Sequence, residues 1–266
     1  MNTMTTIPHF DTPRASTMTL PRLLHAYLIE AKYEFLRMLR TPGFVVPMLA
    51  LPVLLYILLG VLIFGESTAK DPQLAIYMFA SYVVFAVTTP GMFGFGVGLA
   101  MERQSGVLRL KRAQPMPMAA NLFAKLAMAL AVVAIVLAIL IPIATAAGHV
   151  SLSLPQLANV VLVSLLSTMT CCAIGFFIGA MVSGSAATGV VNLIYFPMMY
   201  LSGMFFPLPK FLAQWAVIWP TFYMDQLVVA AAGGKTFMAT NICVAVLVGL
   251  TVLFGGLAIR KLTRRG

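Results

Sequence analysis

Between Leu201 and Asp225 the chain reads LSGMFFPLPKFLAQWAVIWPTFYMD. Pro207, Pro209 and Pro220 exclude one continuous helix, because proline lacks the N–H donor and its ring clashes with the preceding turn. The stretch is nevertheless too apolar and aromatic for a loop in water. Such a chain is stable at membrane depth only as short pieces that are buried in protein or face a cavity. Broken membrane segments of this kind often mark a transport route.

The composition is that of a membrane protein. Of the 266 residues, 61% are hydrophobic and only 9% are charged, whereas about 25% of residues are charged in a soluble domain. No stretch is long and polar enough to form an enzyme domain. The three cysteines lie in apolar runs and form neither a disulfide framework nor a metal-binding spacing, so we expect no metal and no cofactor in this chain. The net charge of +10 indicates membrane topology rather than nucleic-acid binding.

The hydrophobic runs predict six spans, each near the roughly 20 residues that a bilayer requires. The six runs are 44–64, 75–100, 121–147, 156–182, 187–206 and 236–259. We therefore expect an all-α integral membrane protein whose transmembrane domain covers 41–266, with short re-entrant helices in an external region, 201–235, between spans five and six. The polar residues 1–19 lack the apolar core of a signal peptide and are expected to form a disordered cytoplasmic tail.

The basic residues predict the orientation. Fourteen of the 17 Lys and Arg residues lie before the first span, between the second span and the start of the third, or after the last. The other three are Lys70, Lys210 and Lys235. Cytoplasmic loops carry the excess of positive charge, so both termini are expected in the cytoplasm, in agreement with an even number of spans.

Residues 20–40 predict an amphipathic helix at the inner membrane interface. Its apolar face consists of Leu20, Leu23, Leu24, Tyr27, Leu28, Ala31, Phe35 and Leu39. The rest of its surface is polar and consists of Arg22, His25, Glu30, Lys32, Glu34, Arg37 and Arg40. The alternative is a soluble helix packed on a partner protein.

The cytoplasmic loop 101–117 reads MERQSGVLRLKRAQPMP. It is either a basic loop that obeys the charge rule or a short helix whose apolar and basic side chains dock into a groove on a cytoplasmic partner. Both readings fit its composition.

The chain has no nucleotide site that the sequence reveals. Gly233–Thr236 resembles the end of a phosphate-binding loop, but Val229 stands where that motif needs glycine, and the segment opens an apolar span instead of following a strand. Close helix packing is expected at two glycine pairs, Gly94 with Gly98 and Gly175 with Gly179.

The predicted spans contain almost no ionisable groups. Lys125 lies at the start of a span, where its ammonium is expected to snorkel to the interface. The spans hold no series of Asp, Glu and His residues that could relay protons. Ion- or proton-driven transport is therefore disfavoured, and the energy for transport must come from a partner.

At two places the sequence resembles the membrane subunit of type-2 ATP-binding-cassette (ABC) exporters. The family's first cytoplasmic loop typically reads E-R-E-x-G-T-L-E-x-L, then Pro, then Lys, and its counterparts here are Glu102, Arg103, Gly106, Leu108, Pro115 and Lys125. Val107 replaces the usual Thr and Arg109 the usual acid. The second signature matches Leu201, Ser202, Gly203, Phe205, Phe206, Pro207, Pro220, Phe222, Tyr223 and Asp225.

The resemblance implies a permease that is not itself an enzyme. Two copies would pair as a homodimer with two separate cytoplasmic ATPase subunits, which would bind ATP and Mg, in the bacterial inner membrane. The loop would be a coupling helix, with the ATPase-coupling residues Glu102, Arg103, Gly106, Val107, Leu108, Leu110 and Arg112. Of these, Val107, Leu108 and Leu110 would fill a groove on the ATPase.

The pathway and external gate would be formed by Tyr195, Met199, Tyr200, Phe205, Phe206, Pro207, Tyr223 and Asp225. Aromatic and methionine side chains make adaptable apolar surfaces, so we expect a hydrophobic or amphipathic substrate, drug-like or lipidic. Two alternatives stay open. A polysaccharide could pass over the same aromatic surface, or the chain could be a membrane scaffold that recruits a partner without transporting anything.

Overall fold

The computed structural model describes residues 20–113, 118–205 and 214–264, and within these ranges all regular structure is helical. The first half contains α1 (Leu20–Leu39), α2 (Pro42–Leu55), the π-helical η2 (Tyr56–Ile63), α3 (Gly65–Lys70), α4 (Pro72–Thr89), the π-helical η3 (Pro90–Val97), α5 (Gly98–Gln104) and α6 (Val107–Ala113). The second half contains α7 (Met118–Ala146), α8 (Leu154–Met181), α9 (Gly184–Leu201), α11 (Pro220–Ala231) and α12 (Thr240–Arg264). The predicted tail 1–19 lies outside the described residues.

Five helical stretches of the described chain are long and apolar enough to cross a membrane. They are Val45–Ile63, Pro72–Gln104, Ala119–Ala146, Leu154–Met181 and Thr240–Leu262. These confirm five of the six predicted spans. The predicted span 187–206 corresponds to α9, which has only 18 residues, includes Pro197 and is not among the five. A count of six spans is therefore not confirmed.

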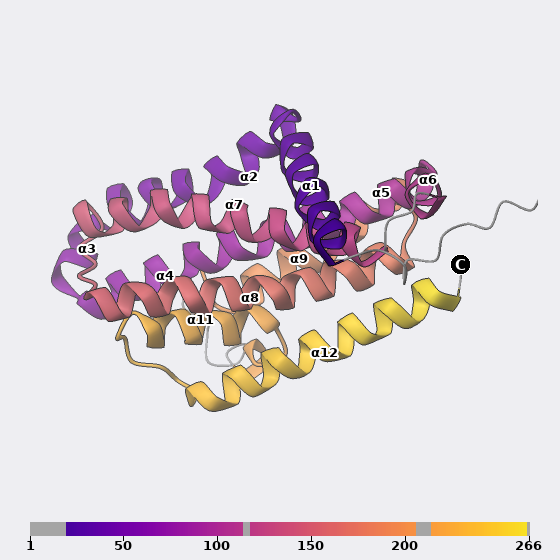
Figure 1. Ribbon diagram of the computed structural model, residues 1–266. Coiled ribbons are helices and arrows are strands. Elements are labelled where there is room, and N and C mark those ends of the chain that lie inside the picture. The colour runs from indigo at the N-terminus through magenta and orange to yellow at the C-terminus, as the bar shows by residue number, and fades with distance from the viewer. Residues whose placement is uncertain (1–19, 114–117, 206–213, 265–266) are drawn as a thin grey trace, which may run out of the picture.

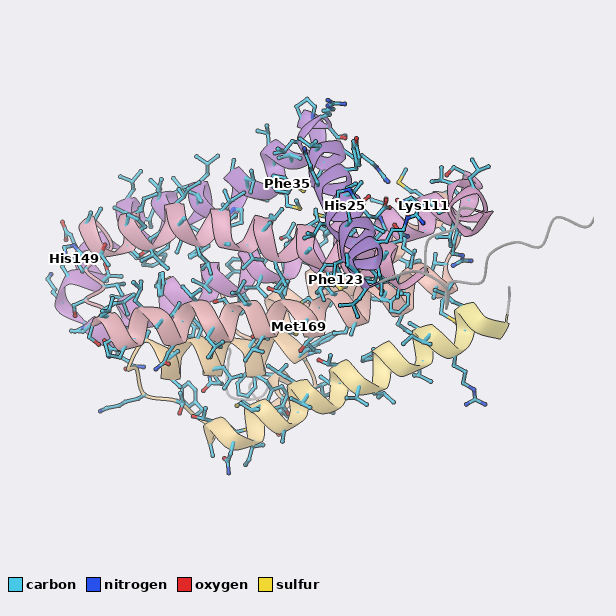
Figure 2. All side chains as sticks on the ribbon, in the orientation of Figure 1. His25, Phe35, Lys111, Phe123, His149 and Met169 are labelled. Carbon is cyan, nitrogen blue, oxygen red and sulfur yellow. The ribbon has the colours of Figure 1, made fainter. Side chains whose placement is uncertain are left out.

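The long helices lie side by side, and α1 crosses them (Figure 1). One end of the bundle carries α3 and the turn between α7 and α8, and the opposite end carries α5, α6 and the C-terminal end of α12. His149 and Lys111 mark these two ends (Figure 2). The α4–η3–α5 rod, Pro72–Gln104, runs from one end of the bundle to the other.

A close helix contact joins η3 to α8. A Cβ added to Gly175 would lie 2.2 Å from the Gly91 carbonyl oxygen, and one added to Gly179 would lie 2.5 Å from that of Gly96. The predicted role of Gly175 and Gly179 in close packing is confirmed. Their partners are five residues apart because η3 is π-helical, with i→i+5 hydrogen bonds.

The stretch after α9 does not continue as a helix, as its prolines predicted. The chain turns at Gly203, which has a φ of +81°, and α11 begins at Pro220. Two hydrogen bonds fix the turn: Ser81 Oγ donates to the Met204 carbonyl at 2.5 Å, and Thr221 Oγ1 donates to the Met198 carbonyl at 2.8 Å. Ser81 lies near the midpoint of α4, so the turn packs beside the middle of that helix.

Candidate functional site

The first helix is held across the beginning of α7. The rings of Tyr27 and Phe123 lie 5.5 Å apart, and both Phe123 and Phe35 lie where α1 crosses the bundle (Figure 2). Met38 packs with Val132 in a separate small core cluster. Of the predicted apolar face, Tyr27 and Phe35 pack on the bundle, whereas Leu20, Leu24 and Leu28 are exposed.

The polar side of α1 is not simply solvated, because its two acidic residues face inward. Lys125, with none of its surface exposed, donates to Glu34 Oε1 at 2.6 Å and to Glu102 Oε1 at 2.9 Å. The expectation that Lys125 snorkels is therefore wrong. An unpaired lysine at membrane depth costs about 3 kcal/mol or more, and the two carboxylates offset that cost, so α1, α5 and α7 meet at one ammonium group.

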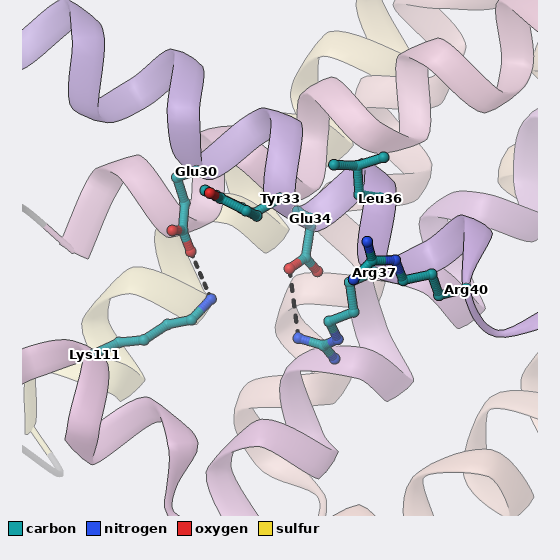
Figure 3. Close-up of a pocket in the computed structure, with 7 residues that line it drawn as sticks. All are labelled: Glu30, Tyr33, Glu34, Leu36, Arg37, Arg40 and Lys111. Atoms are coloured by element: carbon teal, nitrogen blue, oxygen red, sulfur yellow. Dashed lines mark hydrogen bonds and ion pairs between the residues drawn. The ribbon is translucent and has the colours of Figure 1, made fainter.

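The network extends outward from Lys125 through two further cations. Arg37 pairs with Glu102 and lies 3.4 Å from Glu34, and Lys111 of α6 donates to Glu30 at 2.6 Å (Figure 3). Burial alone would lower the pKa of Arg37, but its hydrogen bond to Glu102 and the nearby carboxylates raise that pKa above its ordinary value, so the guanidinium stays charged. We define the ion cluster as Glu30, Glu34, Arg37, Glu102, Lys111 and Lys125.

The loop between α5 and α6 is anchored at three points. Glu102 enters the ion cluster, the Arg103 guanidinium donates to the Gly179 carbonyl at 2.5 Å, and Gln104 Oε1 accepts from the Ser185 backbone N–H at 2.6 Å. Gly106 turns the chain into α6 with a φ of +78°, a backbone conformation that residues other than glycine rarely adopt. The loop is thus fixed to α8 and α9 as well as to α1 and α7.

The leucines that were expected to fill a groove on the ATPase differ in exposure. Leu108 is only 4% exposed and packs in a core cluster with Leu99 and Ala258, so it is not available to a partner in this conformation. Leu110 is 69% exposed, and Val107 is partly exposed. The backbone of Arg112 lies in α6, but its side chain is outside what the structure describes.

The residues predicted for the external gate gather in part around Phe205. The Phe205 ring lies 5.8 Å from that of Tyr82 and 5.7 Å from those of Phe85 and Tyr200. Tyr195 extends this aromatic cluster, with its ring 6.1 Å from Phe85. The cluster joins α4 and α9 to the turn that follows α9.

The other predicted gate residues have different surroundings. Met199 is buried and Tyr200 is exposed. Tyr223 donates its hydroxyl to the Val217 carbonyl at 2.7 Å. Asp225 is buried in α11, and its Oδ1 has no hydrogen-bond partner in the structure. Phe206 and Pro207 lie outside the described residues.

Five members of the ion cluster were not predicted as site residues: Glu30, Glu34, Arg37, Lys111 and Lys125. The sequence does hold a signal for Glu30 and Glu34, since the two acids of the 20–40 helix stand four apart and so share one helical stripe. Lys125 in an apolar span required an acidic partner, and this stripe supplies one.

No cluster of His, Cys, Asp and Glu that could hold a metal occurs among the described residues.

The features that stand out are the anchored loop at one end, the broken segment between α9 and α11, and at least five apolar helices. They define a multi-pass membrane protein. The model of the ABC-2 type transporter family matches residues 25–232, and the chain belongs to that family as its membrane permease component. No curated protein matches the chain. Membership implies association with ATP-binding subunits.

Proposed function

We propose that the chain is the membrane subunit of an ATP-driven exporter in a bacterial inner membrane. Two copies form a path for a hydrophobic or amphipathic compound, and two separate ATPase subunits bind ATP and Mg. The observation that carries this proposal is the anchored loop: α6 presents Leu110 outward, while Glu102 at the other side of the loop reaches Lys125 and Arg37.

Coupling follows from how the charges connect the helices. A partner that pushes on α6 displaces Lys111 and Glu102, and their partners Glu30, Glu34 and Lys125 lie on α1 and α7. Breaking these buried pairs is costly, so the helices move with the loop. The α4–η3–α5 rod carries the displacement to the other end of the bundle.

Toward that other end, beside the middle of α4, the broken segment serves as the external gate. In this proposal α9 completes the sixth crossing, and α11 belongs to a re-entrant segment that enters the membrane from outside between α9 and α12. Six crossings place both termini on one side, in agreement with the 14 basic residues expected in the cytoplasm. The Phe205 cluster closes the path at the turn.

The substrate class rests on the outer face of α9. Leu193, Phe196 and Tyr200 are exposed and recur at i, i+3 and i+7, so they share one face. This face suits the partner copy or an apolar compound. Its two aromatic rings also favour the second candidate, a polysaccharide, because sugars pass over aromatic surfaces.

The test is transport by the reconstituted complex. The chain is co-expressed with candidate ATPase subunits, and ATP-dependent uptake into inside-out vesicles is measured for a fluorescent amphiphile and for a labelled oligosaccharide. We expect uptake of the amphiphile, none with an ATPase variant that cannot hydrolyse ATP, and no ATP hydrolysis by the purified chain alone. Uptake of the oligosaccharide alone supports the glycan exporter, and a stable complex that transports neither supports the scaffold.

A further inference from the structure

The charges on α1 are sorted by sign. Both acids, Glu30 and Glu34, point into the protein and are paired there. The exposed positions instead carry Arg22, Lys32 and Arg40. The outward surface of this helix is therefore cationic, although its sequence contains both signs.

A pocket of about 310 Å³ opens between α1 and α6. It is lined by Glu30, Tyr33, Glu34, Leu36, Arg37, Arg40 and Lys111 (Figure 3). The lining combines an aromatic ring and a leucine with charged groups. Such a lining suits a ligand that has both a charged and an apolar part.

The charges at this pocket do not balance. The ion cluster contains three carboxylates and three cations, and all six are engaged in ion pairs. Arg40 is the additional cation, and within the described chain its guanidinium makes no hydrogen bond or ion pair with a side chain. Figure 3 draws it beside Arg37 at the pocket. The surplus positive charge calls for an anionic group from outside the chain.

The position of α1 beside the start of a membrane-crossing helix would place the pocket near the lipid headgroups. The helix α1, which ends one residue before Arg40, crosses the beginning of α7, where Tyr27 meets Phe123, and Phe123 lies within the membrane-crossing stretch Ala119–Ala146. Leu24 and Leu28, on the same helix, are exposed and would face acyl chains. A guanidinium binds a phosphate through paired N–H donors, and basic groups at this level attract anionic lipids.

We propose that this pocket binds the phosphate of an anionic phospholipid, with Arg40 as its principal ligand and Tyr33 and Leu36 against the glycerol and first methylenes. The lipid would bridge α1 and α6 and so fill the cleft beside the ion cluster. This site belongs to the isolated chain and does not depend on what the complex transports.

The test measures lipid retention by the purified chain without ATPase subunits. The protein is extracted from nanodiscs that contain equal amounts of phosphatidylglycerol and phosphatidylcholine, and bound lipid is counted by native mass spectrometry. In detergent no membrane surface potential contributes, so retention reports the site itself. The wild type should retain phosphatidylglycerol over phosphatidylcholine, and Arg40→Gln should reduce that retention roughly fivefold, as expected for the loss of one basic contact.

Arg22→Gln is the matched control, because it removes the same charge from α1, the helix that Arg40 directly follows, at an exposed position that does not line the pocket. It should retain phosphatidylglycerol like the wild type. Equal retention by wild type and Arg40→Gln, or equal losses in the two variants, would overturn the site. Added inorganic phosphate should not displace the lipid; displacement would identify a general phosphate site and overturn the lipid assignment. Arg40 is exposed, so unchanged melting temperatures should exclude misfolding.

Discussion

The ammonium of Lys125 lies 2.6 Å from the carboxylate of Glu34, a residue 91 positions earlier in the chain. This contact joins the crossing helix α1 to the membrane helix α7. Neither residue has appreciable access to water. The pair therefore acts as a buried cross-link between two elements that would otherwise meet only through apolar contacts.

Lys125→Met should destabilise the protein strongly. The change leaves the carboxylates of Glu34 and Glu102 buried without their ammonium partner, and loss of one member of a buried ion pair costs about 3–5 kcal/mol. The melting temperature in detergent measures the effect. Lys32→Met is the control, since Lys32 is exposed on the same α1 helix that carries Glu34. Equal melting temperatures for the two variants would mean that the cluster contributes little to the fold.

Leu108→Asp and Leu110→Asp should fail in different ways. The first places a charge in the core beside Leu99 and should yield unfolded or aggregated protein. The second changes an exposed residue, so the protein should fold normally but bind the ATPase subunits at least tenfold more weakly, on the scale of an apolar anchor lost from an interface. Size-exclusion chromatography and co-purification separate these outcomes. Undiminished ATPase binding by folded Leu110→Asp would remove α6 from the interface.

Gly175→Ala should damage the contact between η3 and α8. The added methyl group would lie 2.2 Å from the Gly91 carbonyl oxygen, and such overpacking costs typically 1–3 kcal/mol or more. Gly249→Ala in α12 is the matched control, because nothing lies within 4 Å of its added Cβ. The control should be neutral or up to about 1 kcal/mol more stable, since alanine is the better helix former. Thermal unfolding in detergent compares the two; equal stability would contradict the close contact.

Phe205→Ala should make the closed complex permeable. The substitution removes ring contacts with Tyr82, Phe85 and Tyr200 and opens a space where the proposed gate closes. Leakage of a small fluorescent solute from proteoliposomes, without ATP, measures this. Phe237→Ala is the control, because Phe237 is almost fully exposed. A Phe205→Ala variant that stays as tight as the control would reduce the turn to a structural element.

Sequence patterns predicted the all-helical membrane class, five of the spans and the break after α9, because each depends on local composition and on proline. Whether α9 crosses the membrane was harder to predict, because an 18-residue helix that contains Pro197 is near the minimum length for a span. The glycine partners on η3 were also not predictable. A π-helical turn places Gly91 and Gly96 on one face, whereas α-helical spacing had selected Gly94 and Gly98.

The site was predictable only in its outline. Glu102 and Lys125 stood out by their positions and pair directly, but the contact of Lys125 with Glu34 depends on how α1 crosses α7, a tertiary arrangement that no local pattern encodes. Leu108 and Leu110 are two positions apart and therefore lie about 200° apart around a helix. One is buried and the other exposed, although both are apolar and were assigned the same role.

The most direct test of the central claim is ATP hydrolysis by the reconstituted complex, measured with and without transported compound for the wild type and for Glu34→Gln. Glutamine keeps the size of the side chain and removes the charge that links α1 to Lys125. We expect substrate to stimulate hydrolysis in the wild type, and we expect Glu34→Gln to assemble and to retain basal hydrolysis while losing most of the stimulation and of the transport. Full stimulation and full transport by an assembled Glu34→Gln complex would contradict coupling through the ion cluster.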